Sequence, residues 1–180
     1  MNKNAFSTRT LVATALGAAL FFVLFKFVSI PSPVPNTNFC VAYGISTFFS
    51  VVFGPLCGGL VAFIGHALTD AVGGYGVWWS WVIGSGVCGA LCGLSKINPE
   101  KGTITTGEWI NFVLVTLVAN AIAWPLVSAA GDVLIYGEVF STVLPQLALA
   151  FVTDSIVCIV VGGILIAAYA KTRVGSDTLE

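Results

Sequence analysis

Several stretches of about 20 mostly apolar residues dominate this sequence, and that length matches a helix crossing a hydrocarbon layer of roughly 30 Å. Only 8% of the residues are charged and 57% are hydrophobic. Such a composition is typical of lipid-embedded chains and not of soluble domains. The first stretch, Leu11 to Ile30, is too long for the core of a secretory signal and lacks a small-residue cleavage site. The sequence therefore predicts an all-α integral membrane protein that keeps its first helix.

Glycine, proline and charged residues divide the chain into six apolar segments. We expect each segment to form a transmembrane helix within a single membrane domain of residues 1–180. The expected helices cover residues 10–30, 40–53, 56–72, 77–94, 109–130 and 140–170. The predicted architecture is a six-transmembrane-helix bundle.

The positive charges predict the orientation of this bundle, because cytoplasmic loops retain Lys and Arg. Basic residues occur before the first segment, between the fourth and fifth, and after the sixth. If the six helices alternate in direction, all of these residues lie on one side: Lys3, Arg9, Lys96, Lys101, Lys171 and Arg173. The connections on the other side, residues 31–38, 73–76 and 131–137, contain neither Lys nor Arg. Both termini are therefore expected in the cytoplasm.

An unusual polar stretch lies in GHALTDAVGGYGVWWSW, which carries His66 and Asp70 inside an apolar segment. Residues at i and i+4 share one face of a helix. In the predicted topology His66 lies near the middle of the membrane and Asp70 in its outer half. An ionisable residue at this depth normally faces the interior of the bundle and often marks a ligand site.

Other polar and aromatic residues fall at similar depths on the later helices, among them Gln146. We therefore predict a substrate-binding cavity open to the outside, formed by Asn36, His66, Asp70, Trp78, Trp79, Asn120, Trp124 and Asp154. Two other interpretations stay open. The polar residues could simply form hydrogen bonds between helices, and Trp78 and Trp79 could belong to an aromatic belt at the membrane interface.

Motifs for chemistry are not found in the sequence. The cysteines are scattered through apolar segments, and no histidine accompanies Cys88 and Cys92 at the spacing of a zinc site. We expect no metal and no cofactor. A nucleotide-binding loop, a hydrolase motif and a basic patch for nucleic acid are likewise missing. An intramembrane enzyme using His66 and Asp70 as acid and base would lack a nucleophile, so we do not expect an enzyme.

Small residues mark the first helix in LVATALGAALF, where Ala15 and Ala19 are one turn apart. Such a stripe allows another helix to approach closely inside lipid. On its own this pattern is also compatible with ordinary packing within the bundle.

The chain resembles, over nearly its full length, the membrane-embedded S components of energy-coupling factor (ECF) transporters, the vitamin-importing branch of ATP-binding cassette (ABC) systems. The similar motifs are GAALF, IPSPVPNT, FGPLCGG, IGHALTD, GYGVWWSW, LVANAIAW, GDVLIY and AYAKTR. This resemblance implies a six-helix subunit that binds its substrate from outside and assembles with a transmembrane T subunit and two ABC ATPases. It also implies that Ala15 and Ala19 form the contact with the T subunit.

The alternative to such a subunit is a stand-alone carrier or channel, which would need a continuous polar path. The substrate is open: Asp70, Asp132, Glu138 and Asp154 favour a neutral or cationic ligand, because anionic vitamins usually require Arg or Lys. We favour cobalamin or another corrinoid, for which the outer loops are long and aromatic enough. Thiamine or its pyrimidine precursor is the alternative.

Overall fold

The computed structural model describes residues 7–174, so Lys3 lies outside the described residues. This part of the chain is almost entirely helical, with two short strands and two π-helical segments. The elements are α1 (Thr8–Val28), β1 (Ile30–Pro31), β2 (Asn38–Phe39), α2 (Ala42–Phe53), α3 (Pro55–Gly73), α4 (Trp79–Cys92), η1 (Pro99–Lys101), α5 (Thr106–Ile122), η2 (Ala123–Ser128), α6 (Ala129–Ile135), α7 (Phe140–Val157), η3 (Cys158–Gly162) and α8 (Gly163–Val174).

Four helices are long and apolar enough to cross a membrane: Thr8–Val28, Pro55–Gly73, Thr106–Ile135 and Phe140–Arg173. Two of them join several elements, because the π-helical segments connect α5 to α6 and α7 to α8 without a break. Helices α2 and α4 are apolar but shorter. Each expected segment thus contains helix, with ends shifted by a few residues. That all six cross the membrane and that both termini are cytoplasmic remain predictions.

Local sequence signals account for several helix ends. The Ser7 side chain accepts a hydrogen bond from the backbone N–H of Thr10 at the start of α1. At the start of α5, Thr105 and Glu108 form a reciprocal capping box. Helix α3 begins with Pro55, whose missing N–H costs nothing in the first turn. It ends before Gly74, whose φ of +83° is strained for any residue with a side chain.

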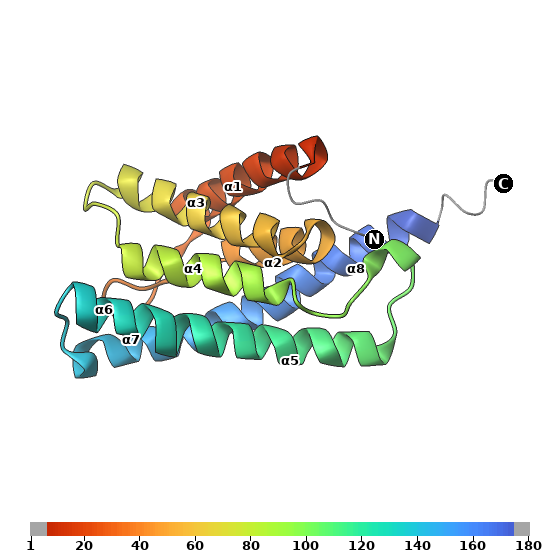
Figure 1. Cartoon of the computed structure of the whole chain (residues 1–180). Helices are drawn as coiled ribbons and strands as arrows, with labels where there is room; N and C mark the ends of the chain where they lie inside the picture. Colours follow the sequence, from red (N-terminus) through yellow and green to blue (C-terminus); the bar gives the residue numbers. More distant parts are fainter. Residues whose placement is uncertain (1–6, 175–180) are drawn as a thin grey trace.

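The connections of the bundle lie at its two ends (Figure 1). The α3–α4 and α6–α7 connections are at the left end of Figure 1, and the α4–α5 connection and the end of α8 are at the right. Polar contacts tie this right end together: the Arg9 guanidinium is 3.5 Å from the Tyr169 hydroxyl, and Arg173 Nε is 3.2 Å from Glu100 Oε2. The basic segments at the start of α1, beside η1 and at the end of α8 therefore share one end, as the charge pattern predicts.

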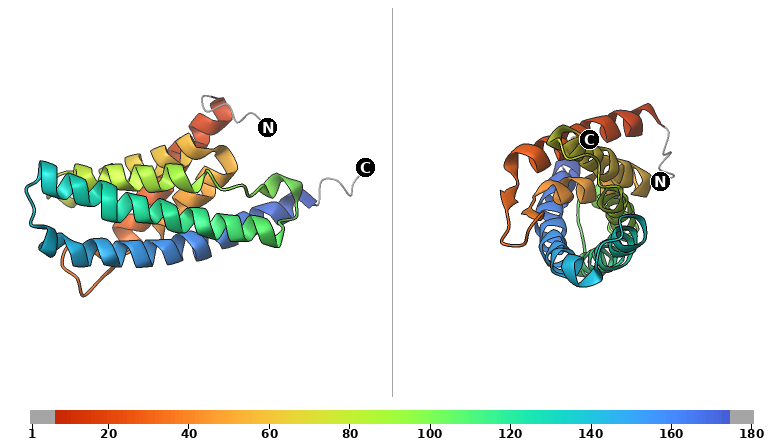
Figure 2. Two further views of the ribbon diagram at one scale, coloured as in Figure 1. Left: turned by 60° about the horizontal axis from the view of Figure 1, so that its bottom comes forward. Right: turned by 90° about the vertical axis from the view of Figure 1, so that its left-hand side faces the viewer.

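Helices α3 and α4 approach each other closely through glycine. A side chain on Gly89 of α4 would overlap the carbonyl group of Gly58 on α3, and one on Gly65 would come within 2.6 Å of the Phe21 ring of α1. Helix α1 packs against α2 and α3 and crosses on the outside of the bundle (Figure 2, right). One side of α1 is therefore buried, while the opposite side is free for lipid or a partner.

A β-hairpin replaces the loop that the sequence predicts between the first and second helices. Ile30 pairs with Phe39 and Pro31 with Asn38 in antiparallel register. The turn between them contains Asn36 at a φ of +58°, a conformation that asparagine tolerates better than most residues. The hairpin carries Asn36 to the same end of the molecule as the α3–α4 connection.

Candidate ligand-binding site

A cavity of about 440 Å³ lies at the end of the bundle opposite the basic end, where Arg9 contacts Tyr169 and Arg173 contacts Glu100. Its walls come from α1, the hairpin, α2, α3, the α3–α4 connection, α4, α6, the α6–α7 connection and α7. Small-molecule sites usually have volumes of roughly 300 to 1,000 Å³ and a mainly apolar wall with a few polar groups. The cavity is thus large enough for a small organic ligand.

Five predicted substrate-binding residues line this cavity: Asn36, His66, Asp70, Trp78 and Asp154. They come from the hairpin, from α3, from the connection that follows it and from α7. Residues this far apart in sequence meet because successive helices run in opposite directions and return to the same end. The structure therefore brings these side chains together as expected, and their contact with a ligand stays a prediction.

The other three predicted residues do not belong to the cavity wall. The Trp79 side chain is 48% exposed and lies beside Phe63 on the outer surface, with ring centroids 6.2 Å apart. Trp124 is completely buried, and its indole Nε1 donates to Asn120 Oδ1 over 3.0 Å. These positions support the interpretation of Trp79 as a membrane-facing aromatic residue and of Asn120 with Trp124 as a bond within the bundle.

Trp81 takes the place in the cavity wall that the sequence analysis gave to Trp79. Its ring lines the cavity, and its centroid is 5.4 Å from that of the buried Trp124. Trp78 and Trp81 lie three residues apart around the start of α4, so they face the same side of the helix, whereas Trp79 points away. Helical spacing counted from the first tryptophan would have found this pair.

Asp132 of α6 fixes both cavity tryptophans. Its Oδ1 accepts from Trp78 Nε1 over 2.7 Å, and its Oδ2 accepts from Trp81 Nε1 over 2.8 Å. The Ser80 hydroxyl also donates to this carboxylate. Asp132 is 1% exposed, so these donors satisfy a charge that would otherwise be costly to bury. From the sequence alone Asp132 is only a charge near the ligand, and its positioning role becomes visible in the fold.

Asp70 holds the connection between α3 and α4. Its Oδ2 accepts from the backbone N–H of Trp78 over 3.0 Å, and its Oδ1 accepts from the Tyr75 hydroxyl over 3.2 Å. Partial burial of the hydroxyl and then the Asp70 carboxylate raise the pKa of Tyr75 to about 12. Tyr75 therefore remains a hydrogen-bond donor at neutral pH. His66 Nε2 lies 3.6 Å from Asp70 Oδ1, which confirms that the two residues share one face of the helix.

The structure adds a serine to this pair, which the sequence analysis did not foresee. His66 Nδ1 is 2.6 Å from Ser85 Oγ, and Ser85 Oγ is 3.0 Å from the Tyr43 hydroxyl. Serine, histidine and aspartate therefore lie in a row. Ser85 is completely buried and does not line the cavity, so a substrate bound there would not reach its hydroxyl. The row is best explained as a hydrogen-bond chain that orients His66.

The charges around the cavity all have one sign. The wall contains the carboxyl groups of Asp70, Asp132, Glu138 and Asp154, and no Lys or Arg of residues 7–174 contributes to it. Aromatic side chains of Phe25, Tyr43, Tyr75, Trp78 and Trp81 supply much of the remaining surface. Such a site can bind a flat ring by stacking and can accept hydrogen bonds or a positive charge from it, whereas it repels anions.

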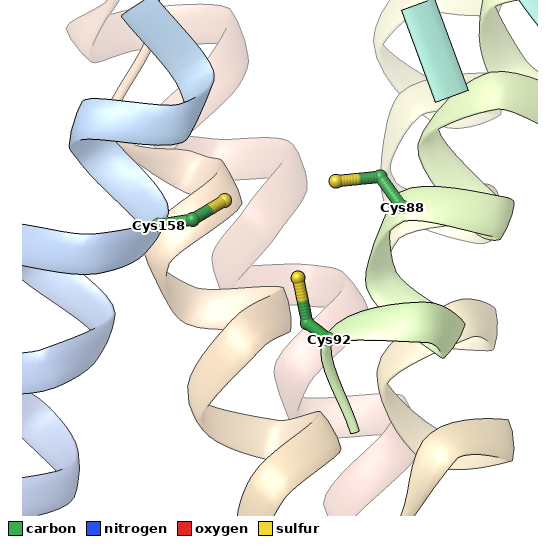
Figure 3. A group of neighbouring side chains, drawn as sticks. All are labelled: Cys88, Cys92 and Cys158. Atoms are coloured by element: carbon green, nitrogen blue, oxygen red, sulfur yellow. The ribbon is translucent and has the colours of Figure 1, made fainter. Parts of the chain in front are cut away.

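Three buried cysteines lie close together between α4 and the start of η3 (Figure 3). The Sγ atoms of Cys88, Cys92 and Cys158 lie within 4.8 Å of one another, a separation that would suit a soft metal ion. The spacing of Cys88 and Cys92 places these two on one helix face, whereas Cys158 joins them only in the fold. Two of the thiols already donate hydrogen bonds, Cys88 to Asn120 Oδ1 and Cys158 to the Tyr43 carbonyl. The trio is therefore accounted for by packing of small, weakly polar side chains.

Comparisons with known proteins agree with the resemblance in the sequence. A family model described as "ECF-type riboflavin transporter, S component" matches residues 5–171. A "UPF0397 protein" of Streptococcus sanguinis is 43% identical over 174 residues, covering 96% of each chain. A protein of the same description from Lactiplantibacillus plantarum is 43% identical over 183 residues, covering 99% of this chain and 98% of the relative.

A third relative, from Lactobacillus johnsonii and also described as a "UPF0397 protein", is 38% identical over 181 residues, covering 99% of this chain and 98% of the relative. No solved structure matches the chain. The family match covers nearly the whole sequence, and the relatives align from end to end. The chain therefore belongs to the family of S components of ECF-type riboflavin transporters.

Proposed function

We propose that this multi-pass cell-membrane protein captures a vitamin or related micronutrient in its outer cavity and presents it to a transmembrane T subunit and two ABC ATPases. S components bind substrate and are not enzymes, so ATP hydrolysis would belong to the partner ATPases. The observation that carries this proposal is the cavity itself. It collects aromatic rings and hydrogen-bonding groups at one end of the bundle, opposite the basic end.

The remainder of the interior argues against a stand-alone carrier or channel. Between the cavity and the basic end, the bundle contains an apolar cluster in which Val51, Ile97, Phe112 and Ile166 are buried. A channel would need polar groups along its whole path, and this cluster interrupts such a path on the side of the basic end. The arrangement therefore favours a closed binding site over an open pore.

The volume of the cavity favours a compact ligand. At about 440 Å³ it lies in the lower part of the range of roughly 300 to 1,000 Å³ that is usual for small-molecule sites. Thiamine, its pyrimidine precursor and riboflavin, the vitamin in the family description, are all of this order of size. A corrinoid such as cobalamin is several times larger and would enter only if the hairpin and the α3–α4 connection moved apart. We therefore place the compact heterocycles before the corrinoid that the sequence analysis favoured.

The outer side of α1 provides the proposed contact with the T subunit. Ala15 and Ala19 are exposed, whereas Gly17 and Ala18 between them are buried against the bundle. Large apolar residues flank the two alanines, with Leu16 60% exposed and Leu20 49% exposed. A shallow track of small residues between larger ones is a geometry that a second membrane helix can fill closely. This placement supports Ala15 and Ala19 as docking residues.

A comparison of two tryptophan variants would test the location of the binding site. Replacing Trp81 by alanine removes a ring from the cavity wall and should weaken binding of the copurified vitamin roughly 10- to 100-fold. Replacing Trp79 by alanine removes a similar ring from the outer surface and should leave the affinity unchanged. Mass spectrometry of the purified protein identifies the ligand, and calorimetry measures its dissociation constant. Equal losses in both variants, or none in either, would contradict this location.

The outer loops should become ordered when the ligand binds, because they form part of the cavity wall. Residues 31–38 combine proline with the turn at Asn36, and residues 73–76 contain three glycines. We expect slower amide hydrogen exchange in both segments after ligand is added, by several-fold or more. Residues 93–105 at the opposite end serve as the internal control and should not change. Unchanged exchange in both outer segments would indicate a rigid, preformed pocket.

A further inference from the structure

Asp154 differs from the other aspartates of the cavity, because its side chain has no partner in the part of the chain that the structure describes. It is only 4% exposed, yet its side chain lines the cavity. Among residues 7–174 no hydrogen bond or ion pair to its carboxyl group is found within bonding distance. Asp70 and Asp132 line the same cavity, and donors of the protein itself satisfy both of them. Glu138 of the cavity wall also lacks a side-chain partner among residues 7–174, but it is only half-buried. Asp154 is therefore the buried carboxyl group that the described fold leaves available to a ligand.

Burying a carboxylate without a partner costs free energy, because the group loses its hydration and forms no hydrogen bond or ion pair instead. Proteins normally offset this cost with a nearby Lys or Arg, and the described cavity wall contains neither. A positive partner for Asp154 would then come from outside the described residues. The ligand itself is the group that enters this space, so the cost of burying Asp154 would be recovered when a cationic ligand binds.

The aromatic residues of the cavity suit the same kind of ligand. Phe25, Tyr43 and Trp81 line it together with Asp154. Phe25 and Tyr43 have ring centroids 6.0 Å apart. Aromatic faces attract cations as well as flat rings, most strongly where water is excluded. The wall thus offers stacking surfaces beside a buried carboxyl group that has no partner among the described residues.

We propose that Asp154 is the counterion of a positively charged group on the substrate, and that the substrate is a flat heterocycle with a fixed positive charge. This inference rests on the proposed function of the cavity. It separates two of the compact candidates, because the thiazolium ring of thiamine carries such a charge and riboflavin is neutral. It also separates thiamine from its own pyrimidine precursor, which lacks the charged ring.

The test compares Asp154→Asn with Ser155→Ala in the full-length purified protein. Asparagine keeps the shape of the side chain and removes its charge, while Ser155 is the next residue on α7, is buried and does not line the cavity. Thiamine, its pyrimidine precursor and riboflavin are titrated separately by calorimetry. We expect wild type and Ser155→Ala to bind thiamine more tightly than riboflavin, and Asp154→Asn to lose roughly 10- to 100-fold in thiamine affinity.

Thermal unfolding without ligand distinguishes a counterion from a structural residue. Asp154→Asn should unfold at the same or a higher temperature than wild type, since it removes an unpaired buried charge. A marked fall in unfolding temperature would instead assign Asp154 to the fold and overturn the inference.

The outcomes also separate this inference from the proposed function. If riboflavin or the pyrimidine precursor binds as tightly as thiamine, and Asp154→Asn binds like wild type, the counterion role is wrong while the vitamin-binding function stands. If none of these vitamins, nor cyanocobalamin, binds to the wild-type protein and none copurifies with it, the proposed function fails and the inference fails with it.

Discussion

Replacing Asp132 by alanine is expected to lower the free energy of unfolding by about 3 to 5 kcal/mol and to abolish ligand binding. The variant leaves the indole N–H groups of Trp78 and Trp81 and the hydroxyl of Ser80 without their acceptor. Each buried donor that loses its partner costs about 1 to 3 kcal/mol. Both cavity rings lose their fixed orientation at the same time. Thermal unfolding and calorimetric titration of the purified protein measure the two effects.

Two variants serve as controls for this experiment. Asp132→Asn keeps one acceptor oxygen and should show a smaller loss of stability than Asp132→Ala. Glu138→Gln changes another carboxyl group of the cavity wall, but Glu138 is only half-buried, so the stability should stay close to that of wild type. If Asp132→Ala unfolds like Glu138→Gln, the hydrogen bonds from Trp78 and Trp81 do not hold α4 against α6.

The helical framework was predictable because lipid imposes simple length and composition rules on a chain. The lengths of the apolar segments, and the glycine and proline residues between them, place every long helix within a few residues of its observed ends. The hairpin at residues 30–39 was not predictable in the same way, since its strands are two residues long and their pairing depends on α1 and α2 arriving side by side. The same limit applies to η2, where Pro125 widens the helix locally.

The site was partly predictable, and the differences follow from side-chain direction. His66 and Asp70 were assigned to one face by their spacing, and the structure confirms this arrangement. Trp79 was assigned to the cavity because of its depth, but the exact start of α4 turns it outward and brings Trp81 inward. Asn120 and Trp124 lie at a suitable depth and satisfy each other. The depth of a residue in the membrane follows from counting residues along its helix. The direction in which its side chain points depends on where the helix begins and on how it packs.

The function of Asp132 lay beyond sequence reasoning for a different reason. Its partners are 51 to 54 residues away in the chain, so no local pattern connects them. The burial of an aspartate in an apolar helix signals an unknown partner, and only the assembled α4 and α6 identify it. Asp154 gives the same signal, yet within residues 7–174 no other residue acts as its partner.

Replacing Ala15 or Ala19 by tryptophan is expected to abolish uptake in cells that contain the T subunit and the ATPases. The two alanines form the shallow track on the exposed side of α1, and a bulky ring there would hold the partner helix away. Overlap in a tight helix contact costs about 1 to 3 kcal/mol, which corresponds to about 5- to 150-fold weaker association. Copurification with the T subunit should fall together with uptake.

Val118→Trp is the matched control, because it adds a tryptophan at a site that is 58% exposed on α5, away from α1. This variant should assemble and transport like wild type. Ligand binding to the isolated protein should survive in Ala15→Trp and Ala19→Trp, because neither alanine lines the cavity. A variant that still binds the ligand but no longer supports uptake or assembly is expected for a subunit that needs ATPase partners. If instead the chain reconstituted alone moves substrate at a rate that these substitutions do not alter, it acts as a stand-alone carrier, and α1 has no docking role.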